Sequence, residues 1–87
     1  MNQNSPNFLL AAEQIKKLKS KPTDQELLEL YGLYKQATVG DINIDKPFFT
    51  FGKDYEKWKV WNNFKGTSVY DSECKYITLV NTLINKY

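Results

Sequence analysis

The sequence contains no histidine and no arginine, and its single cysteine is Cys74. The missing histidine removes the most common general base and excludes zinc sites of the Cys/His type. One cysteine cannot form an internal disulfide, which fits a reducing compartment. No apolar run is long enough for a signal peptide or a membrane span, so we expect a cytoplasmic protein without stable membrane insertion.

All twelve basic residues are lysines, and against ten acidic residues they give a formal net charge of +2. This excess is too small for a general nucleic-acid binder, which usually concentrates basic charge. It still permits a local cationic patch that binds a small anion. The length predicts a single domain over residues 1–87, with a core in which the aromatic side chains carry much of the burial.

The first helix is predicted to begin near Ser5, which can cap it, with Pro6 in the first turn. Its apolar stripe recurs at helical spacing and contains Phe8, Ala12, Ile15 and Leu18. Lys16 lies beside this stripe, one turn after Ala12. The lysines that follow are expected to form a solvated face near the helix C-terminus, where cations are favoured; these are Lys17, Lys19 and Lys21.

The second helix is predicted from Thr23, where Glu26 completes a capping box, to about Val39. Its broad apolar sector contains Leu27, Leu30, Tyr31, Tyr34, Ala37 and Thr38. Gly32 lies inside this helix and weakens it by about 1 kcal/mol relative to alanine. The sequence leaves two interpretations of Gly32 open: a close approach to the helix backbone, or a glycine tolerated at the surface.

Two tyrosines and a lysine crowd the end of the second helix. Tyr31 and Lys35 are four residues apart and share a face, with Tyr34 one step around. Flat rings beside a cation suit a phosphate that is attached to a stackable base. The alternative is a core aromatic next to a solvated charge.

The connection over residues 41–52 is long, and Asn43, Pro47 and Gly52 are poor helix formers. It carries five large apolar side chains, namely Ile42, Ile44, Phe48, Phe49 and Phe51. We expect the phenylalanines to be packed into the core, although one of them could instead line an apolar groove.

The third helix is predicted from Lys53 to about Phe64, with Lys57 at the edge of its aromatic face. The fourth begins after Ser68, and its inner face is predicted to contain Cys74, Ile77, Val80, Ile84 and Tyr87. Cys74 is therefore expected to be a small buried hydrophobe and not a nucleophile. Tyr76 lies at the margin of this face, either as an amphipathic ring or as a ligand contact.

Four amphipathic helices without a convincing strand predict an all-α fold. The short links after the first and third helices predict antiparallel neighbours, whereas the long link lets the second and third helices run in the same direction. The expected architecture is a four-helix up-down-down-up bundle.

The string Tyr34-Lys35-Gln36-Ala37-Thr38-Val39-Gly40-Asp41 resembles the signature of the acyl-CoA-binding protein family. Further segments that stand in the family's order and spacing cover nearly the whole chain: Phe8 with Ala11-Ala12-Glu13, Leu18-Lys19, Lys21-Pro22-Thr23-Asp24, Gly40-Asp41-Ile42-Asn43, Pro47, Lys57-Trp58, Trp61-Asn62, Lys65-Gly66-Thr67-Ser68 and Tyr76-Ile77. The resemblance implies a monomeric bundle that binds long-chain acyl-CoA esters without changing them chemically.

The resemblance also implies roles for particular residues. Lys35 and Lys57 are expected to hold the phosphates of CoA, chiefly the ribose 3′-phosphate, assisted by the hydroxyl of Tyr31. The other implied contacts are Tyr34 and Ala12 beside the adenine, Lys16 nearby, Lys53 as a further cation, Tyr76 closing the site and Leu27 against the acyl chain. With Gly32 and Leu33 added, the ligand-binding residues predicted are Ala12, Lys16, Leu27, Tyr31, Gly32, Leu33, Tyr34, Lys35, Lys53, Lys57 and Tyr76.

The function predicted is that of an intracellular carrier and pool former for medium- to long-chain acyl-CoA in lipid metabolism, with no cofactor and no metal. An enzyme such as a thioesterase is disfavoured, because the sequence lacks a nucleophile elbow and any pairing of cysteine with a base. The remaining alternative is a helical module that uses its lysine and tyrosine surface to bind a protein or a nucleic acid.

Overall fold

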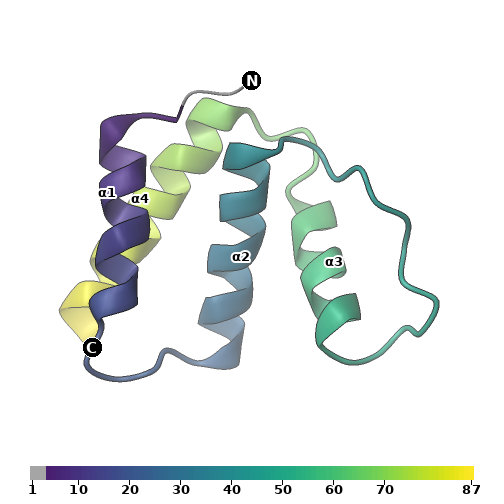
Figure 1. Ribbon diagram of the computed structural model, residues 1–87, viewed down its shortest axis with the longest axis horizontal. Coiled ribbons are helices and arrows are strands. Elements are labelled where there is room, and N and C mark those ends of the chain that lie inside the picture. Colours follow the sequence, from purple (N-terminus) through teal and green to yellow (C-terminus); the bar gives the residue numbers. More distant parts are fainter. Residues whose placement is uncertain (1–3) are drawn as a thin grey trace.

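Four α-helices and one short 3₁₀ turn form the regular structure of residues 4–87, the part of the chain that the computed structural model describes (Figure 1). They are α1 (Pro6–Gln14), the turn η1 (Ile15–Lys17), α2 (Asp24–Thr38), α3 (Lys53–Asn63) and α4 (Val69–Lys86). No strand occurs within these residues. The predicted all-α architecture is confirmed.

Three of the four helices begin with the side-chain caps that the sequence predicts. The hydroxyl of Ser5 accepts a hydrogen bond from the amide of Phe8, and that of Ser68 accepts one from Asp71. At α2 the capping box of Thr23 and Glu26 is complete in both directions. These bonds satisfy amide groups that have no partner inside the helix, so the starts of α1, α2 and α4 are locally determined.

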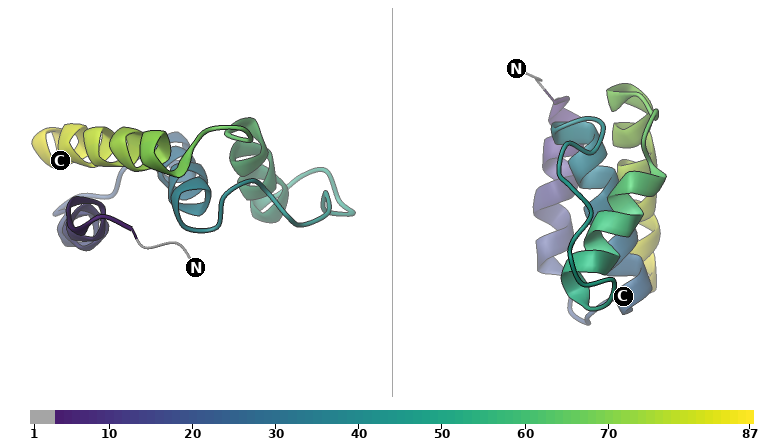
Figure 2. Two further views of the ribbon diagram at one scale, coloured as in Figure 1. Left: turned by 90° about the horizontal axis from the view of Figure 1, so that it is seen from above. Right: turned by 90° about the vertical axis from the view of Figure 1, so that its right-hand side faces the viewer.

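The helices run in the predicted up-down-down-up order: α2 and α3 run in one direction, α1 and α4 in the other (Figure 1). The packing partners differ from the prediction, because α1 packs against α4, α4 against α2, and α2 against α3 (Figure 2). The short links reverse the chain, and the helices that they join lie farther apart than these three pairs, although the Phe8 ring of α1 reaches the Tyr34 ring of α2. The result is a flat molecule with extents of 36 × 30 × 16 Å.

The core lies where α1, α2 and α4 meet. Its buried apolar side chains are Phe8, Ala11, Leu30, Leu33, Ala37, Tyr76, Val80 and Leu83. The predicted inner face of α4 is partly wrong, since Cys74 and Ile84 are exposed, whereas Val80 is buried and Ile77 and Tyr87 are half-buried. The apolar periodicity was misleading because two polar residues, Ser72 and Glu73, occupy inner positions.

Glu73 is buried because the N-terminal segment supplies its hydrogen-bond donors. Its Oε2 atom accepts bonds from the Asn4 side chain at 2.7 Å and from the Ser5 amide at 3.0 Å. Burial raises the pKa of Glu73, but these hydrogen bonds outweigh it and the pKa lies below its ordinary value. Asn4 also donates to the carbonyl of Ala37, so one side chain ties the N-terminal segment to both α2 and α4.

The connection between α2 and α3 runs along the outer side of α3, at the end of the molecule opposite α1 (Figure 1). The prediction that its phenylalanines are packed into the core is wrong: Phe48, Phe49 and Phe51 are 93%, 62% and 71% exposed. Polar anchors hold this connection instead. The indole N–H of Trp58 donates to the carbonyl of Ile44, and that of Trp61 donates to the carbonyl of Gly40.

At Gly32, α2 lies so close to the end of α3 that there is no room for a side chain. A Cβ atom at this position would lie 2.9 Å from Cε2 of Phe64 and 3.1 Å from the carbonyl oxygen of Val60. The glycine is buried, so the interpretation as a close approach to the backbone is confirmed and the surface interpretation is wrong.

Candidate ligand-binding site

A cavity of about 440 Å³ opens between η1, α2 and α4. It is lined by Ile15 and Lys16 of η1, by Leu27, Leu30, Tyr31, Tyr34 and Lys35 of α2, and by Tyr76 of α4. Its volume lies in the range of small-molecule sites, and most of its wall is apolar. Two lysines on an otherwise apolar lining suit a ligand that combines an anion with a hydrophobic part.

Three aromatic rings pack together beside this cavity, and two of them, Tyr34 and Tyr76, line it. The ring centres of Phe8 and Tyr34 are 5.7 Å apart with an angle of 26° between the rings. Tyr76 packs on both, with ring centres 4.9 Å from Phe8 and 5.9 Å from Tyr34. Tyr34 is nevertheless 41% exposed, so its ring is held by two neighbours and still offers surface on which a flat group can stack.

Two lysines cross between α2 and α3 in opposite directions. The ammonium of Lys57, on α3, lies 5.4 Å from the centre of the Tyr31 ring on α2. The ammonium of Lys35, on α2, lies 5.1 Å from the Trp61 ring on α3. Neither lysine forms an ion pair within residues 4–87. Aromatic faces thus position both cations while leaving them free to bind an anion.

Lys16 differs from these two lysines because it already has an acidic partner. Its ammonium lies 3.1 Å from Oε2 of Glu13, one turn earlier, and both side chains are largely exposed. An exposed pair of this kind is weak, so Lys16 can exchange its partner at little cost.

Tyr76 brings a neutral hydroxyl to the cavity. Burial, and to a lesser degree the neighbouring Tyr34, raises the pKa of Tyr76 to about 12. The phenol therefore remains protonated at physiological pH and is a hydrogen-bond donor. Its hydroxyl makes no hydrogen bond within the part of the chain that the structure describes.

The structure brings six of the eleven predicted site residues together in the cavity: Lys16, Leu27, Tyr31, Tyr34, Lys35 and Tyr76. Lys57 joins them from α3 through its contact with Tyr31. The ligand contacts themselves stay predictions.

Four predicted residues lie elsewhere. Ala12 is half-buried against the core, and Gly32 faces Phe64 near α3. Leu33 is buried in the core, and Lys53 lies beside Leu28 and Gly52 at the start of α3. Gly32 and Leu33 follow Tyr31 in the chain, but consecutive helical residues point in different directions, so neither reaches the cavity.

Two lining residues, Ile15 and Leu30, are absent from the site that the sequence predicts. Both were assigned to the core, with which they also pack. The spacing of Leu27, Leu30, Tyr31 and Tyr34 along one helix face was the available signal. An apolar residue that serves both the core and a cavity wall looks the same in sequence as one that serves only the core.

Two residues of the signature string, Gln36 and Asp41, make structural hydrogen bonds. The Gln36 amide donates to Oδ1 of Asp41 at 2.8 Å and to the carbonyl of Thr67 at 3.0 Å. The same Oδ1 atom accepts a bond from the Gly66 amide, and this bond, followed by the one from Gln36, lowers the pKa of Asp41. These bonds join the end of α2 to the link between α3 and α4.

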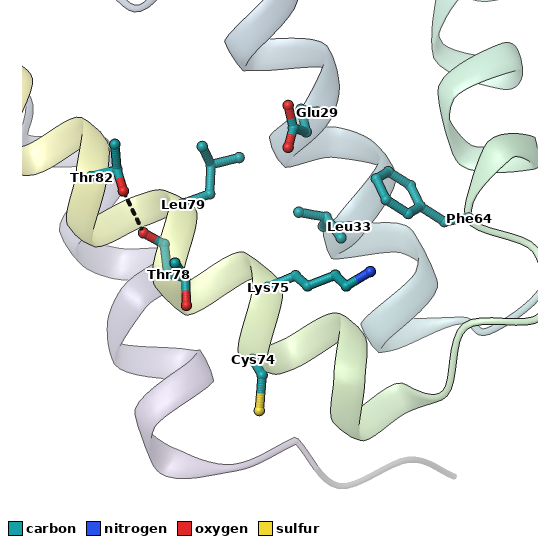
Figure 3. Close-up of a pocket in the computed structure, with 8 residues that line it drawn as sticks. All are labelled: Glu29, Leu33, Phe64, Cys74, Lys75, Thr78, Leu79 and Thr82. Atoms are coloured by element: carbon teal, nitrogen blue, oxygen red, sulfur yellow. Dashed lines mark hydrogen bonds between the residues drawn. The ribbon is translucent and has the colours of Figure 1, made fainter.

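A second cavity, of about 450 Å³, lies between α2 and α4 and reaches Phe64 (Figure 3). It is lined by Glu29, Leu33, Phe64, Cys74, Lys75, Thr78, Leu79 and Thr82. Its one lysine is accompanied by one carboxylate, so this cavity has no excess positive charge. In Figure 3 the thiol of Cys74 points away from the other lining side chains. The cavity beside Tyr34 and Lys35 is therefore better suited to an anionic ligand.

The fold and the cavity beside Tyr34 and Lys35 describe a small helical domain with a site for an amphipathic anion. The family model described as "Acyl CoA binding protein" matches residues 5–80. The acyl-CoA-binding protein of Saccharomyces cerevisiae is 53% identical over 76 residues, which cover 87% of each chain. This chain belongs to the acyl-CoA-binding protein family.

Solved structures agree with this assignment. The solution structure of the yeast acyl coenzyme A binding protein is 50% identical with a TM-score of 0.76, and the match covers 97% of this chain and 98% of that one. The crystal structure of the protein from Moniliophthora perniciosa is 33% identical with a TM-score of 0.87, covering 99% and 85%. Within residues 4–87, no helix is long and apolar enough to cross a membrane, and no three potential metal ligands are grouped.

Proposed function

We propose that this protein binds medium- to long-chain acyl-CoA esters non-covalently and acts as their intracellular carrier and pool former. The observation that carries the proposal is the cavity in which Tyr34 and Lys35 stand beside Leu27 and Leu30. A stacking ring and a cation suit the nucleotide end of CoA, and the leucines suit an acyl chain. Supporting this assignment, the relatives that match nearly the whole chain are named for binding acyl-CoA.

The two ends of such a ligand would contribute differently. Each buried methylene contributes about 0.8 kcal/mol, so a long acyl chain supplies gross energy on the order of 10 kcal/mol before ordering costs are subtracted. The lysines would select for CoA, because only a ligand with phosphates pairs their charges. A free fatty acid would gain from the apolar wall but leave most of the cationic charge unpaired.

The proposal assigns Lys35 and Lys57, with the Tyr31 hydroxyl, to the phosphates, and Tyr34 to the adenine. Lys16 and Tyr76 also line the cavity. Lys16 would assist in binding the nucleotide end, and the hydroxyl of Tyr76 would donate a hydrogen bond to the ligand. Ala12 and Lys53 lie outside the cavity lining, so a ligand would reach them only by extending past its rim.

The carrier would act as a single domain and as a monomer in the cytoplasm, and would release its ligand unchanged. Catalysis would require an activated nucleophile, and the sequence contains no histidine to activate one. Steady release of thiol from palmitoyl-CoA by the purified protein would contradict this part of the proposal. The alternative of a module that binds nucleic acid receives no support from the relatives.

Isothermal titration calorimetry tests the proposal directly. Delipidated protein is titrated with palmitoyl-CoA, with free CoA and with palmitate. We expect tight binding of the ester at one molecule per protein, weak binding of CoA and little binding of palmitate. Failure of the folded protein to bind the ester would overturn the proposal.

A further inference from the structure

Three phenylalanines stand exposed together on the connection between α2 and α3. We call Phe48, Phe49 and Phe51 the phenylalanine cluster. The ring centres of Phe48 and Phe49 are 5.1 Å apart at 84°, and those of Phe49 and Phe51 are 5.6 Å apart. The rings thus contact one another while Phe48, the first of them, is 93% exposed. Exposed apolar patches mark surfaces that interact with a protein, a membrane or a ligand.

The backbone beneath the cluster is held in place from both sides. Before the cluster, the carbonyls of Gly40 and Ile44 accept hydrogen bonds from the indoles of Trp61 and Trp58. After it, the carbonyl of Gly52 accepts a hydrogen bond from the amide of Glu56 in the first turn of α3, at 3.0 Å. The rings are therefore presented by an anchored connection, which lowers the entropy that would be lost when they bind.

The charged residues nearest to the cluster in the sequence are lysines. Lys46 precedes it and Lys53 follows it, and no acidic residue lies between these two lysines. The ammonium of Lys46 lies 6.0 Å from the centre of the Tyr55 ring, beside the connection. Asp45 and Asp54 lie just outside the two lysines. Two cations therefore flank the rings directly, and this arrangement complements anionic headgroups around a hydrocarbon interior.

The chemistry of the cluster favours lipid over a folded protein partner. A hollow of about 380 Å³ beside the rings is lined by the cluster itself, Pro47, Gly52, Lys53 and Asp54. The cluster's side chains offer no hydrogen-bonding group, whereas a protein interface carries about one hydrogen bond per 100–200 Å². A bilayer requires only apolar side chains that enter it and cations that stay at its surface.

We propose that the phenylalanine cluster docks this protein reversibly on lipid bilayers, with the rings entering the headgroup region and Lys46 and Lys53 facing lipid phosphates. The cluster lies at the end of the molecule opposite α1, where a bilayer can approach it without displacing a helix (Figure 1). This docking is a property of the ligand-free protein and does not depend on the proposed acyl-CoA site.

Vesicle flotation tests the docking. Ligand-free protein is mixed with vesicles of phosphatidylcholine alone or of phosphatidylcholine and phosphatidylserine in equal amounts. The test variant is F48S/F49S/F51S, and the matched control is L9S/L10S, which removes exposed apolar side chains from α1. We expect the test variant to lose about tenfold or more of the bound fraction and the control to match the parent. Lys46→Gln should weaken binding more to the vesicles that contain phosphatidylserine than to those of phosphatidylcholine alone, because only the former carry a net negative charge.

Two further measurements test whether the parent and the test variant have the same fold and the same oligomeric state. Circular dichroism should show the same helicity and melting for the parent and the test variant, because the replaced rings are exposed. Sedimentation should show the same mass for both. A parent that floats with neither vesicle, or a test variant that floats like the parent, would overturn the proposal. A parent dimer that the test variant abolishes would also overturn it, because the rings would then meet a second copy of the chain.

Discussion

The ammonium of Lys57 lies 5.4 Å from the centre of the Tyr31 ring, so α3 brings a cation to a wall of the cavity that α2 supplies. Lys35 makes the reciprocal crossing, from α2 to the Trp61 ring on α3. Each cation is held by a ring and not by a carboxylate within residues 4–87. The pair of helices thus presents unneutralised positive charge, and an anion that binds both lysines relieves their repulsion.

Replacing either lysine by alanine should weaken acyl-CoA binding without unfolding the protein. A hydrogen bond to a charged group contributes about 1.5–3 kcal/mol, so Lys57→Ala and Lys35→Ala should each reduce affinity for palmitoyl-CoA by roughly 10- to 100-fold. The melting temperature should change little, because neither ammonium has an ionic partner to lose. Calorimetric titration and thermal denaturation of each variant give the two quantities.

Lys59→Ala is the matched control for these variants. Lys59 is on the same helix as Lys57, and its ammonium lies over a different ring, Tyr55, at 5.4 Å. Tyr55 does not line the cavity, whereas Tyr31, the ring beneath Lys57, does, so removing Lys59 takes away one positive charge without touching the proposed site. Equal losses in the three variants would show that only the net charge matters and would contradict a specific site.

Tyr76→Phe should separate binding from folding. The variant keeps the ring that packs on Phe8 and Tyr34 and removes only a hydroxyl that has no hydrogen bond within the described chain. The melting temperature should therefore stay the same or rise, while affinity for palmitoyl-CoA falls by about 3- to 10-fold if the hydroxyl donates to the ligand. Absorbance titration should also lose one tyrosine that titrates near its pKa of about 12. A lower melting temperature with unchanged affinity would assign the hydroxyl to the fold instead.

Gly32→Ala should destabilise the protein, although alanine is the better helix former. The added Cβ atom would lie 2.9 Å from Phe64 and 3.1 Å from the backbone carbonyl of Val60. The gain in helix propensity is about 1 kcal/mol, whereas overpacking costs typically 1–3 kcal/mol, so a net loss in the free energy of unfolding is expected. Urea denaturation measures it.

The double variant Gly32→Ala/Phe64→Ala identifies the cause. If the clash with the Phe64 ring dominates, truncating that ring should recover part of the loss, and the two substitutions should be non-additive. Strict additivity would mean that the Val60 backbone, and not the Phe64 ring, opposes the methyl group.

The helix starts could be predicted because their causes are local. The capping box of Thr23 and Glu26 depends on residues within one turn, and both of its hydrogen bonds are present. The inner face of α4 could not be predicted in the same way. Glu73 is buried only because Asn4 and Ser5, nearly seventy positions earlier, donate to its carboxylate. No apolar period in α4 indicates such partners.

The same distinction applies to the candidate site. Tyr31, Tyr34 and Lys35 could be placed together because helical spacing alone puts them on neighbouring positions of α2. The meeting of Lys57 with Tyr31 depends on how α3 lies on α2, so it was available only through the family resemblance. The exposure of the phenylalanine cluster had no sequence signal either, because an aromatic run in a loop reads the same whether it is packed or exposed.

Acidic pH should weaken the junction between α2 and the C-terminal end of α4. The carboxylate of Glu26 accepts hydrogen bonds from Lys86 at 2.8 Å, from the Tyr87 hydroxyl at 2.7 Å and from the Thr23 amide at 2.9 Å. Lys86 first, then Tyr87 and the Thr23 amide, lower the pKa of Glu26 from 4.5 to about 2. The folded state therefore favours the ionised form more than the unfolded state does.

It follows that Glu26 stabilises the fold fully above its unfolded pKa of 4.5 and progressively less as the pH falls to about 2. Glu26→Gln should lower the melting temperature at neutral pH, and the difference from the parent should shrink over that acidic window. Glu29→Gln is the control, because the Glu29 carboxylate makes no hydrogen bond or ion pair within residues 4–87. Thermal denaturation, monitored by circular dichroism at several pH values in this range and at neutral pH, measures the difference in melting temperature. A difference that stays constant down to pH 2 would show that Glu26 acts through the shape of its side chain, because loss of its charge would then have no effect.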